Sequence, residues 1–187
     1  MKYAKECLCS AKSIRFIDIM EEKEIRDLSL SVLDAFRAEK KTFATAESCT
    51  GGYIAKAVTD NAGASEVFLG CIVSYANSVK EKLLSVSSET LSRYGAVSAQ
   101  TAEEMARGAV SALGCDFAVA VTGIAGPSGG SADKPVGLVY IAVAGKNIPA
   151  VAKRHIFDGA RDDVRKSTVK SALSMLISTL EKSGAAR

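Results

Sequence analysis

The chain has 187 residues, of which 48% are hydrophobic and 24% are charged, with 24 Lys and Arg against 21 Asp and Glu. This length and composition are typical of one soluble domain with its own core. A net charge of +3 without a block of Lys and Arg argues against a nucleic-acid-binding protein. No run approaches the roughly 18 apolar residues of a membrane-spanning helix, so we predict binding to neither nucleic acid nor a membrane.

The N-terminal segment shows no clear apolar period and no continuous apolar stretch of a secretory signal. We predict that residues 1–19 are an N-terminal extension, disordered or added by an upstream start, and that residues 20–187 form one domain. Five cysteines at irregular spacing indicate reduced thiols, so we expect a cytoplasmic protein. His155 is the single histidine, which excludes a zinc site needing two, and we predict no metal.

The first half of the domain alternates helices and strands. Apolar residues at helical spacing predict a helix over residues 21–40. A short extended segment, 42–47, leads into Thr50, Gly51 and Gly52, which open a helix ending near residue 60. An apolar run of strand length covers residues 66–75, and a helix over 77–84 follows.

The second half begins with two helices, over residues 88–94 and 98–113. Residues 116–122 are almost wholly apolar, as expected of a central strand covered on both faces. Strands over 136–144 and 150–157 flank a Gly-Lys-Asn turn and should form a hairpin. The last predicted helix covers residues 162–180.

The connections between strands predict their directions. Helical segments join the first three strands, which should therefore run parallel. The fourth strand lies between a helix-free loop and a tight turn, so it should run antiparallel to the third and fifth. The prediction is an α/β fold of three layers, α/β/α, with a five-stranded mixed sheet. Ser48, Tyr75 and Thr122 then fall at the carboxyl ends of the parallel strands, where such sheets bind ligands.

Ser48 follows the first strand and precedes the helix opened by Gly51 and Gly52. A hydroxyl there lies near free backbone N–H groups and the positive end of a helix, which favour a nucleophile that develops negative charge. The alternative is that Ser48 or Thr50 caps the helix, and this segment alone favours capping.

A serine nucleophile needs a base, and Lys80 is the candidate because one helical turn after the second strand brings it to the same end of the sheet. A lysine accepts a proton when burial lowers its pKa. The alternative is a solvated surface lysine. Tyr75 is a candidate proton relay or substrate ligand, or a packing residue with a wet hydroxyl.

The segment Thr-Gly-Ile-Ala-Gly-Pro-Ser-Gly-Gly at residues 122–130 is the strongest local signal, because its glycines allow backbone N–H groups to approach an anion. It lacks the Gly-Lys-Ser/Thr ending of a nucleoside-triphosphate loop and departs from the dinucleotide pattern. Arg161 begins the last helix, where a cation opposes the helix dipole. A phosphate would offset this charge, and so would Asp158, Asp162 or Asp163 in a purely structural version.

Five ordered blocks together resemble the CinA C-terminal domain family, over about residues 24–180. They are Ala-Glu-Ser-Cys-Thr-Gly-Gly (46–52), Ser-Tyr-Ala-Asn (74–77) with Lys80, Gly-Ala-Val-Ser (95–98), Thr-Gly-Ile-Ala-Gly-Pro (122–127) and Lys-Pro-Val-Gly-Leu-Val (134–139). Family members with known activity are nicotinamide-nucleotide amidohydrolases. The resemblance therefore implies hydrolysis of the carboxamide of nicotinamide mononucleotide to nicotinate mononucleotide and ammonia, without a metal or an organic cofactor, in pyridine nucleotide recycling.

The resemblance also implies the roles of individual residues. Ser48 would attack the amide, Lys80 would act as base and then as acid, Tyr75 would support proton transfer, and Thr122 with neighbouring N–H groups would receive the oxyanion. The residues implied in substrate binding are Thr50, Gly51, Gly52, Asn77, Gly123, Gly126 and Arg161. A homodimer fits the resemblance and the domain size.

Two other functions remain open from the sequence. One is a non-catalytic nucleotide-binding module, or an interaction module related to competence or DNA damage, that keeps the pocket without hydrolysis. The other is a Ser-Lys hydrolase for a different amide. Ammonia release, ligand binding and a panel of carboxamides distinguish the three.

Overall fold

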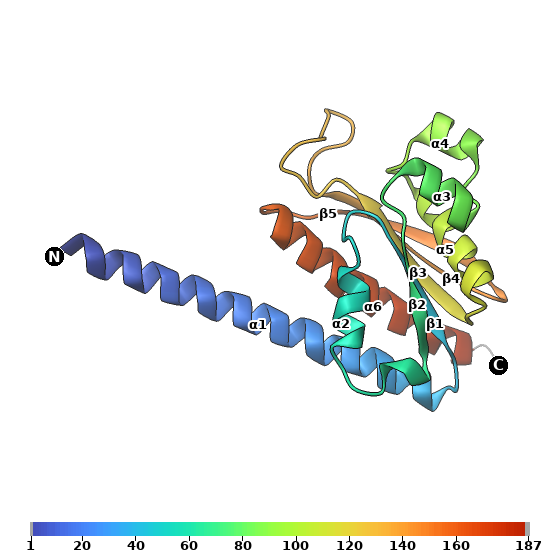
Figure 1. Ribbon diagram of the computed structural model, residues 1–187, viewed down its shortest axis with the longest axis horizontal. Coiled ribbons are helices and arrows are strands. Elements are labelled where there is room, and N and C mark those ends of the chain that lie inside the picture. The colour runs from blue at the N-terminus through green and yellow to red at the C-terminus, as the bar shows by residue number, and fades with distance from the viewer. Residues whose placement is uncertain (1, 186–187) are drawn as a thin grey trace.

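The computed structural model describes the backbone of residues 2–185 and the side chains of residues 19–184. Within these residues a five-stranded sheet lies between two layers of helices (Figure 1). The helices are α1 (Lys2–Ala38), α2 (Tyr53–Thr59), α3 (Asn77–Leu84), α4 (Ser88–Tyr94), α5 (Ala99–Leu113) and α6 (Arg161–Ala185), with a 3-10 helix, η1 (Ala64–Glu66). The strands are β1 (Phe43–Glu47), β2 (Phe68–Val73), β3 (Phe117–Gly123), β4 (Leu138–Gly145) and β5 (Ile148–Ile156). The predicted three-layer α/β/α fold is confirmed.

The strand order is β2-β1-β3-β4-β5. β1 runs parallel to β2 and β3, whereas β4 runs antiparallel to β3 and to β5. The register pairs Ala44 and Glu47 of β1 with Ala118 and Val121 of β3. The predicted antiparallel fourth strand and the central position of β3 are therefore confirmed, and the carboxyl ends of β1, β2 and β3 meet at one edge.

The two faces of the sheet carry side chains of different size. On β3, Val119 and Val121 pack toward α1, α2 and α6, whereas Ala118 and Ala120 pack toward α3 and α5. Alanines on that face let α5 lie close to the sheet, because a helix approaches most closely where side chains are small. At Gly108 of α5 there is no room for a Cβ beside the main chain of Leu84. This close contact fixes α3, the helix that carries Lys80.

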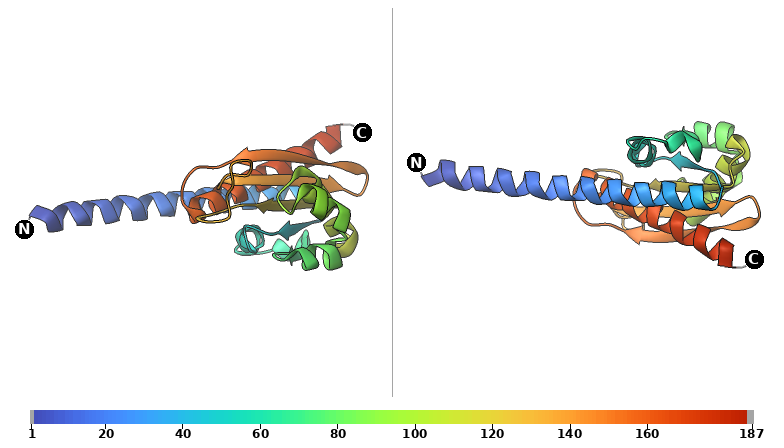
Figure 2. Two further views of the ribbon diagram at one scale, coloured as in Figure 1. Left: turned by 90° about the horizontal axis from the view of Figure 1, so that it is seen from above. Right: turned by 90° about the horizontal axis from the view of Figure 1, so that it is seen from below.

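Helices α1 and α6 lie side by side on the opposite face (Figures 1 and 2). The helix predicted over residues 21–40 is the second part of α1, which begins at Lys2. Once a helix has formed, each further residue is added at low cost, so its start is not marked by the apolar pattern. The division into an extension, residues 1–19, and a domain stays a prediction. Within the described chain, neither α1 nor another helix combines the length and apolar character needed to cross a membrane.

Candidate active site

The turn after β1 presents Ser48 at the carboxyl edge of the sheet. It closes through Gly51 and Gly52, whose φ angles of 62° and 96° are left-handed and favour glycine. Gly52 is the N-cap of α2 and supplies no side-chain hydrogen bond. The hydroxyl of Thr50 instead donates to Glu47 over 2.7 Å. The interpretation that Ser48 or Thr50 caps α2 is therefore wrong, because the side chain of Glu47 accepts from the first N–H groups of the helix.

Lys80 reaches Ser48 from the other side of the same edge. Its Nζ lies 3.2 Å from Ser48 Oγ and donates to the carbonyl oxygens of Ser74 over 2.7 Å and Tyr75 over 3.4 Å. Only 1% of Lys80 is exposed, so the alternative of a solvated surface lysine is wrong. Burial lowers the pKa of Lys80 below its ordinary value of 10.5, since an ammonium ion loses its hydration there. The pair has the geometry of a nucleophile beside a base.

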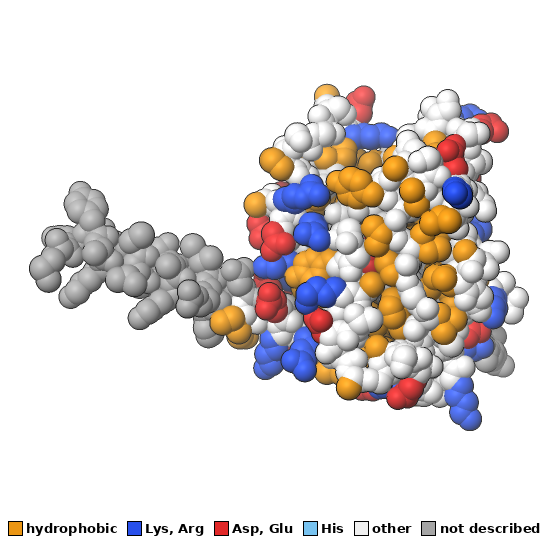
Figure 3. All heavy atoms as spheres, in the orientation of Figure 1, with side chains coloured by type: hydrophobic (Ala, Val, Ile, Leu, Met, Phe, Trp, Pro, Cys, Tyr) orange, Lys and Arg blue, Asp and Glu red, His pale blue; other side chains and the backbone are white. Residues whose placement is uncertain are grey.

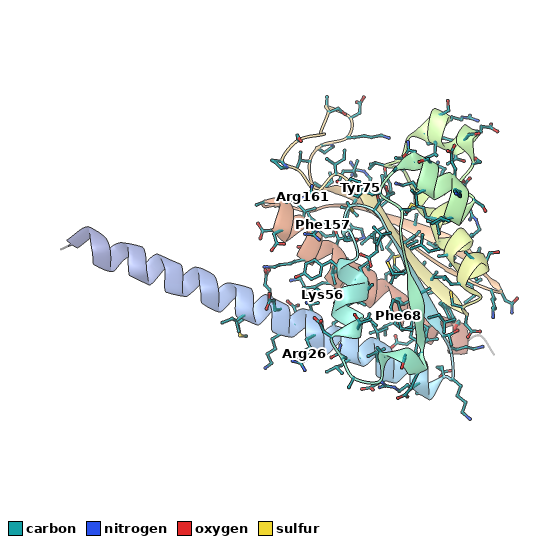
Figure 4. The ribbon with its side chains drawn as sticks, in the orientation of Figure 1. Arg26, Lys56, Phe68, Tyr75, Phe157 and Arg161 are labelled. Carbon is teal, nitrogen blue, oxygen red and sulfur yellow. The ribbon has the colours of Figure 1, made fainter. Side chains whose placement is uncertain are left out.

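A cavity of about 270 Å³ opens at this pair. Its lining residues are Ser48, Cys49, Tyr75, Lys80, Ala96, Val97, Thr122, Gly123, Ile124, Ala125, Gly126, Ser128, Gly129 and Arg161. Tyr75 and Arg161 come from different elements but lie at the same edge of the sheet (Figure 4). The cavity therefore gathers residues from the end of β1, the end of β2, the start of α3, the glycine-rich loop (residues 122–130) and the start of α6.

Tyr75 and Thr122 occupy different positions in this cavity. Tyr75 is 66% exposed and forms part of the rim, whereas Thr122 is buried. The hydroxyl of Thr122 donates to the carbonyl oxygen of Ala96 over 2.7 Å, which ties β3 to the segment before α5. In this arrangement the Thr122 proton is engaged, so donation to an oxyanion would require the hydroxyl to turn away from Ala96.

Arg161 connects α6 to the glycine-rich loop. Its Nη1 donates to the carbonyl oxygen of Gly126 over 2.8 Å. Two of the carboxylates considered as structural partners of this arginine have other contacts, because Asp162 lies 3.1 Å from Lys166 and Asp163 accepts from the N–H of Ala160. Arg161 therefore brings a guanidinium group to the cavity wall, where it can meet an anionic ligand.

Cys49, directly after Ser48, also brings a nucleophilic side chain to the cavity. Burial raises the pKa of its thiol to about 12, and the charge of Glu47 adds to this effect. Because the thiolate is the reactive form, Cys49 is inert at neutral pH. Ser48 is therefore the better candidate for the nucleophile.

Four residues implied in substrate binding lie outside this cavity. Gly51 and Gly52 line a separate cavity of about 860 Å³ beside α1, α2 and α6, Thr50 is buried under the turn, and Asn77 is exposed at the start of α3. The role of all four in substrate binding stays a prediction. The larger cavity has no serine, threonine or cysteine among its described lining residues, so the smaller one is the candidate active site.

Two residues near the site, Glu47 and Lys134, were not predicted from the sequence to have a role. Glu47 is fully buried below Ser48, and Lys134 donates to the carbonyl oxygens of Tyr94 and Val97 over 2.8 Å each. In the sequence, Glu47 is marked only as a carboxylate that ends an otherwise uncharged strand. The groups that donate hydrogen bonds to this carboxylate belong mainly to the chain that folds back over it, which the sequence pattern does not show. For residues 19–184, the structure shows no group of three His, Cys, Asp or Glu side chains suited to a metal ion.

The fold and the cavity define a class of α/β protein in which a serine and a buried lysine meet beyond the carboxyl ends of parallel strands. The profile of the CinA C-terminal domain family matches residues 25–180. The chain belongs to this family.

Individual relatives cover most of the chain. The nicotinamide-nucleotide amidohydrolase PncC of Enterobacter agglomerans is 49% identical over 146 residues, which are 78% of this chain and 89% of the relative. PncC of Escherichia coli K12 is 45% identical and covers 84% of this chain and 95% of its own. The crystal structure of the competence/damage inducible protein CihA from Agrobacterium tumefaciens superposes with a TM-score of 0.81 at 46% identity, covering 84% and 96% of the two chains.

Proposed function

We propose that this protein hydrolyses the carboxamide of nicotinamide mononucleotide to nicotinate mononucleotide and ammonia, in pyridine nucleotide recycling. The observation that carries the proposal is the 3.2 Å approach of the buried Lys80 amine to Ser48 Oγ at the cavity. Relatives named nicotinamide-nucleotide amidohydrolase, aligned over most of their length, support the choice of substrate. The cavity volume of about 270 Å³ is near the lower end of the range for small-molecule sites.

In the first half of the reaction, Ser48 Oγ attacks the amide carbon and its proton passes to neutral Lys80 Nζ. The carbonyl oxygen becomes an oxyanion, which backbone N–H groups at the cavity and Thr122 stabilise after the Thr122 hydroxyl leaves Ala96. The C–N bond then breaks as Lys80 returns the proton to the leaving nitrogen, so that ammonia departs and a nicotinate ester of Ser48 remains.

In the second half, water attacks the ester carbon and gives one proton to Lys80. The bond between the carbonyl carbon and Ser48 Oγ breaks, Lys80 returns the proton to Ser48, and nicotinate mononucleotide leaves. Tyr75 at the rim supports these proton transfers. Arg161 and the loop containing Gly123 and Gly126 hold the ribose phosphate, since a guanidinium and backbone N–H groups are ordinary ligands of phosphate.

Ammonia release from nicotinamide mononucleotide tests the proposal. We expect Ser48→Ala to lower kcat by about 10⁴-fold or more, because the attacking atom is lost. Binding of the mononucleotide, measured by calorimetry, should persist. Ser78→Ala, at an exposed serine of α3, is the matched control and should keep wild-type turnover.

Two outcomes would replace the proposal. Tight binding of the mononucleotide without ammonia release would favour a non-catalytic binding or interaction module. Faster hydrolysis of another compound in a panel of carboxamides would keep the Ser-Lys chemistry and change the substrate.

We also propose that the protein is a homodimer that acts in the cytoplasm without nucleic acid. Apolar side chains gather over β2 and α3 (Figure 3). Leu69 and Val73 of β2 are each 45% exposed, and Leu83 of α3 is 48% exposed. An edge strand with exposed apolar side chains is suited to contact with another chain. Light scattering should give twice the chain mass, and Leu69→Lys should shift it toward the monomer. A monomer at all concentrations would contradict the dimer.

A further inference from the structure

Glu47 is a fully buried carboxylate directly before the candidate nucleophile. Its side chain leaves β1 on the face covered by α2. One oxygen, Oε2, accepts from Thr50 Oγ1 over 2.7 Å, from Gly52 N over 3.0 Å and from Ile54 N over 3.1 Å. The other, Oε1, accepts from Ala55 N over 2.8 Å and from Thr45 Oγ1 over 3.2 Å.

These contacts enclose the turn that carries Ser48. The chain leaves β1 at Glu47, passes through Ser48 and returns to the Glu47 carboxylate at Thr50 and Gly52. The turn is also closed by a hydrogen bond from Gly51 N to Ser48 O over 3.1 Å. In the chain, Ser48 therefore lies between the carboxylate and the groups that donate to it.

The main chain of Glu47 is linked to the base as well. Its carbonyl oxygen accepts from Ser74 N over 2.8 Å, and the carbonyl oxygen of Ser74 accepts from Lys80 Nζ over 2.7 Å. The nucleophile and the base are therefore held from one residue, through its side chain on one side and its main chain on the other.

The carboxylate also acts on the neighbouring thiol. Its charge adds to the effect of burial in raising the pKa of Cys49 to about 12. For Lys80, in contrast, burial is the foremost cause of the lowered pKa. The α2 N–H groups that surround the carboxylate oppose its charge.

We propose that Glu47 is a positioning residue, whose carboxylate holds the Ser48 turn so that Oγ stays within reach of Lys80 Nζ. This inference rests on the proposed function, since it concerns the same nucleophile and base. Glu47 does not line the cavity, so it acts through Ser48 and not on the substrate.

The test compares Glu47→Gln with Asp116→Asn. The second variant is the matched control, because Asp116 is also a carboxylate that accepts from a backbone N–H and a hydroxyl, both of Thr42, but precedes β3 at the opposite edge of the sheet. Turnover is expressed per folded molecule, with the folded fraction taken from urea denaturation. We expect Glu47→Gln to lower kcat by about 10- to 100-fold at unchanged KM, since small misplacement of a reacting group has effects of this size. Asp116→Asn should keep the wild-type kcat.

Thr45→Val provides a second, milder variant. Valine has nearly the shape of threonine and is favoured in strands, so the variant should fold while removing one donor to the Glu47 carboxylate. We expect a smaller fall in kcat, again at unchanged KM. A purely structural role of Glu47 would lower the folded fraction and leave kcat per folded molecule at the wild-type value in both variants, which would overturn the inference.

Labelling of Ser48 with a fluorophosphonate separates this inference from the proposed function, because it needs no substrate. If the wild type is labelled but releases no ammonia, the proposed function fails, and slower labelling of Glu47→Gln than of Asp116→Asn still supports the inference. If ammonia is released and Glu47→Gln matches the wild type, the inference alone fails. A wild type that neither reacts with the probe nor releases ammonia would overturn both.

Discussion

Replacing Lys80 by methionine separates the chemistry of the active site from its stability. Methionine keeps an unbranched side chain in the buried space but removes the amine 3.2 Å from Ser48 Oγ. A positioned general base contributes about 10²- to 10⁴-fold to the rate. We therefore expect kcat/KM for ammonia release to fall by this factor, which corresponds to about 3–5 kcal/mol of transition-state stabilisation.

The same substitution has opposing effects on folding. It leaves the carbonyl oxygens of Ser74 and Tyr75 without the Lys80 donor, and an unpaired buried acceptor costs about 1–3 kcal/mol. It also removes an amine whose charged form is disfavoured by burial. Between the lowered pKa of folded Lys80 and its ordinary value of 10.5, the unfolded chain binds more protons, so wild-type stability rises with pH across this window. Lys80→Met should lose that rise.

Urea denaturation from neutral pH to 10.5 measures the stability, and a coupled ammonia assay measures the rate. The acid limb of the wild-type profile of kcat/KM should lie below 10.5, because activity rises as Lys80 loses its proton. Lys82→Met, at an exposed position of the same helix, is the matched control. Wild-type kcat/KM in Lys80→Met would refute the role of the amine as the base.

Three further substitutions test other parts of the site. Arg161→Ala should raise KM by about 10- to 100-fold with a smaller change in kcat, because the proposed charged hydrogen bond to the substrate phosphate would be lost. Steady-state kinetics checks this, and an unchanged KM would contradict it. Lys134→Ala removes the two hydrogen bonds that Lys134, which follows the glycine-rich loop, donates to the carbonyl oxygens of Tyr94 and Val97, so limited proteolysis should cleave the chain around residue 134 faster than in the wild type. Gly108→Ala places a Cβ against the Leu84 main chain and should lower the free energy of unfolding by about 1–3 kcal/mol, together with kcat, as α3 shifts; denaturation at wild-type values would refute the close packing.

The spacing of apolar residues predicted helices and strands well where one face of the element is buried against the rest of the protein. The helices over residues 77–84 and 88–94 have the predicted bounds. In the structure, the side chain of Ser87 caps the second of them by accepting from Thr90 N. The start of α1 was not predicted, because the helix continues beyond the part that packs on the sheet. The assignment of a cap to Ser48 or Thr50 was wrong because contacts outside the local pattern decide it. The side chain that accepts from the N–H groups at the start of α2 is Glu47, on the preceding strand.

The amino-acid sequence by itself determined the class of fold, the direction of each strand and the edge of the sheet at which the reactive side chains gather, because periodicity and connection length act over short distances. Only the tertiary structure decided the state of those side chains. The burial of Lys80, the engagement of the Thr122 hydroxyl with Ala96 and the enclosure of the Glu47 carboxylate all depend on groups that are distant in the chain or fold back over one another. Desolvation and hydrogen bonding are properties of that packed environment, and no local pattern of residues specifies them.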